Sequence, residues 1–337
     1  MGKKIIRVIA VVLIPVVCLY LLTLLLTPKY VNDIPEGSMI AEYYKSEKNN
    51  DVLILGDCEV YENISTVTMW ENYGISSYIR GSAEQLIWQS YYLLEDTLKY
   101  EKPQVVILNV LAMTESDAKS EAYNRMTLDG MKLSKYKIAS VRESMTEEEN
   151  MASYIFPLLR YHSRWSELSS EDFRYMWKTP SVTTNGYLMQ KGVRPVTTIP
   201  KAAPLANYTF SDRNMEYLDK IYSLCKDNGI NLVLMKAPSV YPHWYDEWDK
   251  QVSDYAYEHG ILYLNTINEA GNIGIDYTTD TFDYGQHLNV EGAEKLSLYL
   301  GEQLVKNFRL TDHRQDESYK NAWQTIVNKY YEEKQGD

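Results

Sequence analysis

The chain has 337 residues, of which 45% are hydrophobic, so it can form one large domain or two smaller ones with a substantial core. Its formal net charge is -12, from 46 acidic and 34 basic residues, and no run of Lys or Arg follows the first few positions. Because nucleic acid binding depends on basic side chains that neutralise phosphates, this composition argues against a nucleic acid partner.

The N-terminal region contains an almost uninterrupted apolar segment, residues 5–27. A membrane-spanning helix needs roughly 20 such residues, so we expect residues 1–28 to form a short cytoplasmic start and a transmembrane anchor. Three basic residues lie before or at the start of the segment, and Lys29 is the only nearby base after it. This bias predicts a single-pass protein of the cell membrane with its C-terminal domain outside the cytoplasm. A cleaved signal peptide is the alternative, but its apolar region is usually shorter, roughly 7–15 residues.

Two cysteines, Cys58 and Cys225, lie beyond this segment, and an oxidising compartment would allow them to form one disulfide. Cys58 follows a predicted strand, whereas Cys225 lies within a predicted helix. Nothing in the local sequence favours pairing them, so we favour free thiols.

Short apolar strands alternate with helices after a predicted polar stalk, residues 29–50. We predict five strands, at residues 51–56, 75–81, 104–110, 230–238 and 261–265. The main helices are predicted at residues 83–100, 212–228, 244–259 and 290–307. Apolar strands separated by helices are typical of a parallel sheet covered on both faces. The predicted fold class is therefore α/β, a three-layer α/β/α domain with a parallel five-stranded sheet over residues 51–310.

The third and fourth strands are separated by a long insertion, residues 114–210, which exceeds an ordinary connection. Its first part has a helical pattern, and residues 183–200 contain Gly and β-branched residues that fit a hairpin or a lid. The tail, residues 311–337, contains an amphipathic helix at 318–334 that we expect to pack on the domain.

Candidate site residues follow the predicted strands. Ligands of parallel α/β sheets bind outside the carboxyl ends of the strands, which is where Cys58, Gly81 and Asn109 lie. Far downstream, Asp283 and His287 lie in a polar loop before the last large helix. A nucleophile needs a base, and the base needs an acceptor that orients it. Cysteine, histidine and aspartate meet these needs if the fold brings the two loops together.

Four stretches carry a family resemblance: "ILGDCEVYENI", "GSAEQ", "VVILNV" and "DYGQHLNVEGAEKLSLYL". In this order they resemble the four conserved blocks of the SGNH or GDSL hydrolase superfamily, whose fold is flavodoxin-like. The closest likeness is to its membrane-anchored extracytoplasmic members, which include the D-alanyl transfer protein of teichoic acids and partners of peptidoglycan O-acetyltransferases. "RYHSRWSEL" and "KAPSVYPHW" also look like that group, so the resemblance covers about residues 51–330.

The resemblance implies a role for each residue that matches the blocks. Cys58 occupies the place of the nucleophilic serine, His287 that of the general base and Asp283 that of its partner. The backbone N–H groups of Cys58 and Gly81 and the side-chain amide of Asn109 would bind the oxyanion. Two features depart from the family pattern: the nucleophile is cysteine, and Asp283 precedes His287 by four residues instead of three.

The function implied is that of an extracytoplasmic acyltransferase or esterase that acts on O-acyl groups of a cell-envelope or secreted polysaccharide. A membrane-bound O-acyltransferase is the implied partner, and no cofactor is expected. The alternative is a catalytically inactive subunit that binds or scaffolds a polymer-modifying complex, with Cys58 as a small buried residue of the core.

Five further residues are weaker candidates for substrate binding. Arg160, His162 and Arg164 of the insertion could contact an anionic or sugar substrate, although holding the insertion in place is the alternative that we favour. Lys236 and Trp244 follow the fourth strand, where the rim of a substrate site is expected. The remaining histidines have no metal-ligand spacing, so no metal site is predicted.

Overall fold

The structure is a computed structural model that describes residues 2–29 and 37–336, with the side chains of residues 2–10 and 12 outside the description. The chain divides into two compact units. One comprises Met1–Pro35 and Glu147–Val182, and the other comprises Glu36–Thr146 and Thr183–Asp337. The second, larger unit contains the sheet and is called the α/β unit below.

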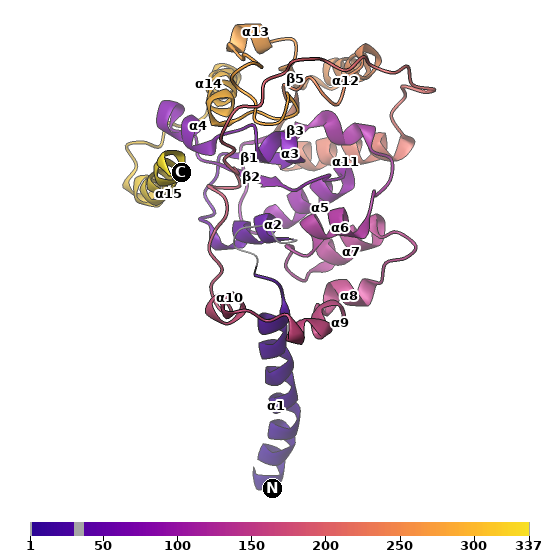
Figure 1. The fold of residues 1–337 in the computed structure, drawn as a ribbon, viewed down its shortest axis with the longest axis vertical. Helices are drawn as coiled ribbons and strands as arrows, with labels where there is room; N and C mark the ends of the chain where they lie inside the picture. The colour runs from indigo at the N-terminus through magenta and orange to yellow at the C-terminus, as the bar shows by residue number, and fades with distance from the viewer. Residues whose placement is uncertain (1, 30–36, 337) are drawn as a thin grey trace. The chain divides into compact units, whose positions relative to one another are not determined.

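The α/β unit is built on a five-stranded parallel sheet of order β2-β1-β3-β4-β5 (Figure 1). Its strands are β1 (Val52–Gly56), β2 (Ser77–Gly81), β3 (Val105–Asn109), β4 (Asn231–Lys236) and β5 (Leu262–Asn265). All five predicted strands are confirmed, and their order is that of flavodoxin-like folds. The register aligns Gly56 with Gly81 and Asn109 with Met235, so the carboxyl ends of four strands meet at one edge.

The helices of the α/β unit confirm the alternating pattern. They are α2 (Ser38–Glu42), η1 (Tyr43–Lys45), α3 (Cys58–Tyr61), α4 (Thr66–Tyr73), α5 (Ile87–Thr97), η2 (Val110–Thr114), α6 (Glu121–Leu128), α7 (Lys135–Ser144), α11 (Asp212–Asp227), α12 (Asp246–His259), α13 (Ala270–Ile273), α14 (Val290–Asn307) and α15 (Glu317–Gln335). Right-handed crossovers place α4 on the opposite face of the sheet from α5 and α11. The packing agrees, because α5 contacts α11 whereas α4 contacts α14. The three-layer architecture is therefore confirmed.

Local signals set the ends of the long helices. Ser211 caps α11 by accepting a hydrogen bond from the backbone N–H of Asn214, at 3.1 Å. Gly260 ends α12 in the left-handed conformation, with φ of 65°, which costs glycine little. These helices begin and end within about two residues of the prediction, because capping residues act locally.

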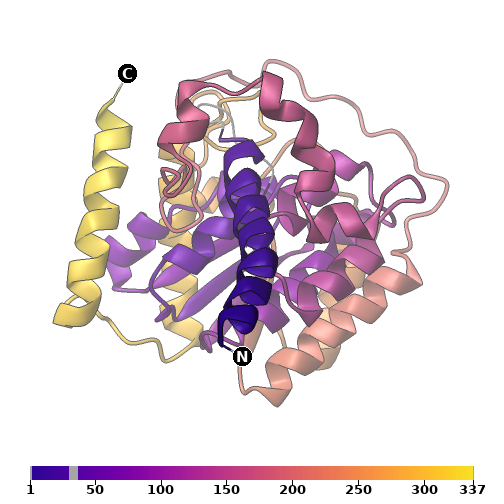
Figure 2. The ribbon, with the colours of Figure 1, turned by 90° about the horizontal axis from the view of Figure 1, so that it is seen from below.

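The C-terminal helix packs on the α/β unit as predicted. Trp323 of α15 is buried and stacks on Trp70 of α4, with ring centroids 4.9 Å apart. α15, yellow in Figure 2, lies along the outside of the unit beside α4. Burial of two large aromatic rings is a strong apolar contribution, so the tail is an integral part of the domain.

The predicted stalk, residues 29–50, is wrong in its second half. Ile40 and Tyr43 are fully buried within the α/β unit. α2 and η1 therefore begin the domain, about 13 residues before the first strand. The prediction failed because the segment is mostly polar, and only a few of its apolar side chains are buried in the domain. Residues 30–36 of the predicted stalk lie outside the described residues.

The smaller unit combines the N-terminal helix with the middle of the predicted insertion. It contains α1 (Gly2–Leu26), α8 (Met151–Ile155), α9 (Leu158–Tyr161), η3 (His162–Ser166) and α10 (Ser170–Arg174). A search of the described part of the chain finds no helix with both the length and the apolar character that crossing a membrane requires. The anchor predicted for residues 1–28 includes side chains outside the described residues, and it stays a prediction.

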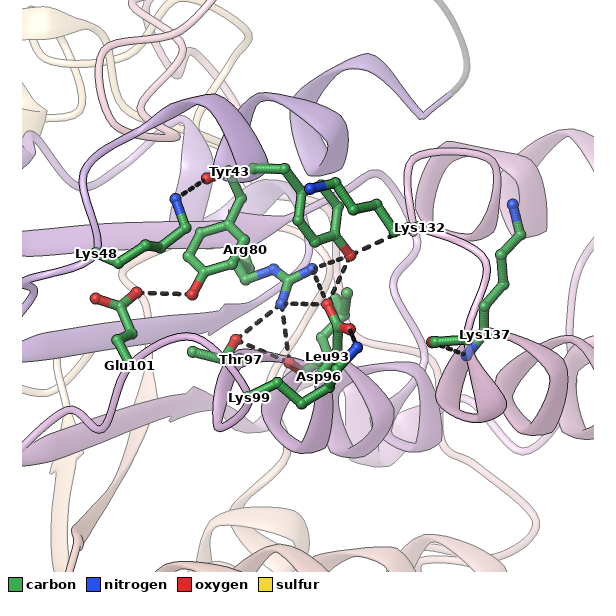
Figure 3. Close-up of polar contacts among 12 residues, drawn as sticks. Tyr43, Lys48, Arg80, Leu93, Asp96, Thr97, Lys99, Glu101, Lys132 and Lys137 are labelled. Carbon is green, nitrogen blue, oxygen red and sulfur yellow. Dashed lines mark hydrogen bonds and ion pairs between the residues drawn. The ribbon is translucent and has the colours of Figure 1, made fainter. Parts of the chain in front are cut away.

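A buried ion pair fixes the end of β2 to α5. Arg80 and Asp96 are both inaccessible to solvent, and Arg80 Nη2 lies 3.2 Å from Asp96 Oδ2. Arg80 Nη1 also donates to Thr97 Oγ1 at 2.8 Å and to the Leu93 carbonyl at 3.0 Å (Figure 3). The carboxylate and neutral oxygens together compensate the desolvated guanidinium.

Two tyrosines complete this cluster. The Arg80 guanidinium carbon lies 4.2 Å from the ring centroid of Tyr43 and 5.3 Å from that of Tyr44. Both rings belong to η1, so cation–π contacts join the first segment of the α/β unit to β2. The end of β2, next to Gly81, is therefore fixed both to α5 and to η1.

We predict that Asp96→Ala lowers the free energy of unfolding by about 3–5 kcal/mol, because it leaves the Arg80 charge buried and uncompensated. Urea unfolding followed by circular dichroism measures the change. Lys99→Ala is the matched control: Lys99 Nζ lies 3.6 Å from Asp96 but is 39% exposed, so its loss should cost less than about 1 kcal/mol. Equal effects of the two substitutions would contradict the account.

Candidate active site

Cys58 lies in the turn between β1 and α3. Asp57 caps α3, and its Oδ1 accepts a hydrogen bond from the backbone N–H of Glu59 at 3.0 Å. Cys58 is the first residue of the helix and is partly exposed. Gly56 permits the close approach of the neighbouring strand, because a Cβ atom there would lie 2.7 Å from Asn109 Cβ. The turn therefore holds the thiol at the carboxyl edge of the sheet.

A buried charge network lies directly beneath this turn. Lys236 Nζ lies 2.6 Å from Glu59 Oε1, and both side chains are excluded from solvent. Asn109 Nδ2 donates to Asp57 Oδ1 at 3.1 Å and to Glu59 Oε2 at 3.0 Å. Lys236 also donates to Ser239 Oγ at 3.0 Å. The ends of β1, β3 and β4 are thus joined by hydrogen-bonded charges.

This network corrects the predicted place of Lys236 at the rim of a substrate site, because its ammonium is fully buried and paired. Trp244 is also buried, and its Nε1 donates to Asp249 Oδ1 at 3.2 Å. Trp248, four residues later, lines the cavity instead. The predicted oxyanion role of Asn109 stays a prediction, and in this arrangement its amide nitrogen donates to two carboxylates.

The downstream loop brings Asp283 and His287 into direct contact. Nδ1 of His287 donates to Asp283 Oδ2 at 2.6 Å, and the backbone N–H of His287 donates to Asp283 Oδ1 at 2.8 Å. Tyr284 and Gly285 lie between them with φ of 66° and 89°, so a tight left-handed turn absorbs the additional residue of spacing. The hydrogen bond places the proton on Nδ1 and leaves Nε2 as the basic nitrogen of the neutral ring.

Two residues that the sequence analysis missed attach this loop to the Cys58 turn. Glu62 Oε2 lies 3.2 Å from His287 Nδ1, and Glu62 Oε1 accepts a hydrogen bond from Gln190 at 2.8 Å. Asn63 Oδ1 accepts a hydrogen bond from the backbone N–H of Leu288 at 2.7 Å. The signal was two consecutive polar residues immediately after α3, in a segment where the flanking side chains are buried.

Cys58 and His287 line the same cavity, whose volume is about 990 Å³. Among the described residues, no hydrogen bond joins the Cys58 thiol to the imidazole. Five acidic side chains contribute to the wall, and they belong to Asp57, Glu59, Glu84, Glu115 and Asp212. Lys119 bridges two of them, with its Nζ 2.7 Å from Glu84 and 3.2 Å from Glu115. The cavity is large enough for a small acylated substrate.

The acidic surroundings control the proton affinity of both reactive groups. Burial, together with the carboxylates of Asp57 and Glu62, raises the pKa of the Cys58 thiol well above its ordinary value. Burial lowers the pKa of His287, but the hydrogen bond to Asp283 and the charge of Glu62 outweigh it, so the net pKa is raised. The site therefore favours the neutral thiol of Cys58, and it keeps the imidazole of His287 protonated to a higher pH than is ordinary for histidine.

The other predicted residues are distributed between the two units. Gly81 ends β2 opposite Gly56, and its oxyanion role stays a prediction. Arg160, His162 and Arg164 belong to the smaller unit. Arg164 binds Asp172 there, at 3.1 Å, which is a structural contact of the kind we favoured.

No metal site emerges in the described part of the chain, where no group of at least three His, Cys, Asp or Glu side chains has suitable geometry for an ion. Cys58 and Cys225 are both free thiols.

Comparisons with known proteins found no matching family model and no matching curated protein. Solved structures gave loose similarities. A proposed acylhydrolase from Bacteroides fragilis is 13% identical with a TM-score of 0.39, over 83% of this chain and 99% of that chain. A proposed lipolytic protein of the G-D-S-L family from Desulfitobacterium hafniense is 13% identical with a TM-score of 0.37, over 76% of this chain and 100% of that chain.

A GDSL-like lipase from Bacteroides thetaiotaomicron is 10% identical with a TM-score of 0.40, over 81% of this chain and 100% of that chain. Similarities of this size do not assign a family or an activity. The function is therefore argued from the geometry of the site.

We predict that His287 titrates above its ordinary pKa of 6.5 and that Glu62→Gln lowers this pKa, because the substitution removes one of its two neighbouring carboxylates. NMR titration of the imidazole measures both values. The charged imidazole stabilises the fold fully below pH 6.5, and this contribution is lost as the pH rises through the raised pKa.

Glu84→Gln is the matched control, because Glu84 lines the same cavity but pairs with Lys119. It should leave the His287 titration close to that of the unsubstituted protein. An unchanged His287 pKa in Glu62→Gln would show that Glu62 does not act on the imidazole.

Proposed function

We propose that this protein is an acyltransferase or esterase in which Cys58 is the nucleophile, His287 the general base and Asp283 its orienting partner. One observation carries the proposal: His287, which is hydrogen-bonded to Asp283, lines the same cavity as Cys58. These three side chains come from loops more than 220 residues apart in the sequence, and the fold brings them to one edge of the sheet.

The acylation step begins with neutral Cys58. As the sulfur attacks the carbonyl carbon of an acyl ester, Nε2 of His287 takes the thiol proton. The tetrahedral intermediate then loses its alkoxide, which receives that proton from His287, and a thioester remains on Cys58. Asp283 keeps Nδ1 protonated throughout and stabilises the imidazolium.

The second step restores the thiol. His287 takes a proton from a sugar hydroxyl or from water, and the oxygen attacks the thioester carbonyl. The bond between carbon and sulfur breaks, and the sulfur regains a proton from His287. A sugar acceptor gives acyl transfer, whereas water gives hydrolysis.

The raised pKa of Cys58 determines how this chemistry proceeds. A preformed thiolate is disfavoured beside Asp57 and Glu62, so the proton must leave during the attack. This requires the neutral form of His287, and the activity should increase as the imidazolium loses its proton. The site therefore resembles one for a hydroxyl nucleophile more than one for a thiolate.

We assign the substrate class by extension of the sequence resemblance. The proposed substrates are O-acyl groups on a cell-envelope or secreted polysaccharide outside the cytoplasm, with the chain held by its N-terminal anchor. A membrane-bound O-acyltransferase is the proposed partner. The cavity volume of about 990 Å³ and its polar wall are compatible with an acylated sugar unit.

An inactive scaffolding subunit is the second candidate function, and two observations favour it. Burial and the nearby carboxylates raise the pKa of the Cys58 thiol. The Asn109 amide donates to Asp57 and Glu59. In this alternative the two loops serve only to bind a polymer or a partner.

We predict that incubation with p-nitrophenyl acetate adds one acetyl group to Cys58, detected by intact-mass and peptide mass spectrometry. Cys58→Ala should abolish this adduct. His287→Ala should slow its formation by about 100-fold to 10,000-fold, which is the usual contribution of a general base. Release of p-nitrophenol measures the rate.

Cys225→Ala is the control for the thiol, because Cys225 is a buried residue of α11 away from the cavity. It should retain the acetyl adduct on Cys58. No adduct in the unsubstituted protein between pH 6 and 9, or an adduct rate independent of His287, would favour the scaffolding function.

A further inference from the structure

The smaller unit exposes an unusual set of aromatic side chains. Every Trp and Phe residue of the chain lies in the described part, and the exposed ones all fall within residues 156–177. They are Phe156 (63%), Trp165 (72%), Phe173 (60%) and Trp177 (69%), with Leu159 (56%) beside them. Single exposed apolar residues are common, but several large ones within one short segment point to an interaction surface.

This segment is fastened to the C-terminal end of α1. Helix α1 contacts α9, η3 and α10, all within the smaller unit (Figure 1). Arg164 of η3 donates to the carbonyl of Leu26, the last residue of α1, and also binds Asp172 at 3.1 Å. Lys29 donates to the Leu24 carbonyl at 2.7 Å. Two cations thus satisfy backbone carbonyls that the helix leaves open at its end.

Over residues 11–22 of α1, the described side chains are apolar and mostly exposed. Its exposed side chains include Val11 (72%), Leu13 (55%), Ile14 (61%), Leu19 (55%) and Tyr20 (56%). The elements that carry the aromatic residues, α9, η3 and α10 among them, therefore contact a helix whose described surface is also apolar. In water, the apolar side chains of the helix and of the aromatic segment would both have to be hydrated, which is unfavourable.

We propose that residues 147–182 form an interfacial collar that docks in the headgroup region of a lipid bilayer, at the point where α1 leaves it. This inference rests on the proposed membrane anchor. Trp is enriched at the boundary between membrane and water because its ring is amphipathic. Phe and Leu insert slightly deeper, and Arg or Lys side chains can reach outward to headgroups.

Depth-dependent fluorescence quenching tests the collar with the full chain in lipid nanodiscs. Lipids brominated near the headgroup end of the acyl chain should quench a large share of the tryptophan emission. The double substitution Trp165→Phe and Trp177→Phe should remove most of that quenching while it leaves acetylation of Cys58 intact. Both residues are exposed, so the substitutions should not impair folding.

Trp248→Phe is the matched control, because Trp248 belongs to the α/β unit and should not contribute to the quenching. If the chain enters nanodiscs but the emission of Trp165 and Trp177 is not quenched, the collar is wrong and the anchor stands. If the chain does not associate with nanodiscs, both are wrong. Neither outcome bears on the Cys58 adduct, which is measured separately.

Discussion

The ion pair between Lys236 and Glu59 is the interaction on which the candidate site depends. Both groups are excluded from water, and their 2.6 Å contact joins β4 to the turn that carries Cys58. Breaking such a pair by removing one partner typically costs about 3–5 kcal/mol, because the remaining charge is uncompensated. The pair explains how a turn of four helical residues holds its position at the edge of the sheet.

The same network determines the electrostatics of the cavity. One ammonium, from Lys236, faces the carboxylates of Asp57 and Glu59, so negative charge remains near the thiol. His287 has two more carboxylates beside it, those of Asp283 and Glu62. They outweigh the effect of burial and raise the pKa of His287. The site is thus organised for proton transfer during the attack. A cysteine protease site, by comparison, stabilises the thiolate with a nearby imidazolium.

Much of the fold follows from local sequence features. Runs such as "VLILG" and "VVILN" are apolar on both faces, and they became the strands predicted for them. Cys58, Asp283 and His287 were identified as candidates because each lies in a polar turn at a strand or helix end. The contact between Asp283 and His287 could not be derived from spacing, since it depends on the left-handed turn at Tyr284 and Gly285.

Contacts between residues far apart in the sequence could not be predicted. Lys236 follows an apolar strand, where a cation is normally exposed, and only the fold reveals the buried Glu59 that pairs with it. Glu62 and Asn63 were missed because their partners lie more than 220 residues away. The division of the insertion between two units was also not predicted. Its contacts with the end of α1 leave no pattern in the local sequence.

The central claim is that neutral His287 activates a neutral Cys58 thiol, and the pH dependence of Cys58 acetylation tests it most directly. The rate should rise with an apparent pKa equal to that of His287 measured by NMR, and both should fall together in Glu62→Gln. A rate that instead follows the more alkaline ionisation of the Cys58 thiol, measured by thiolate absorbance, would contradict the account.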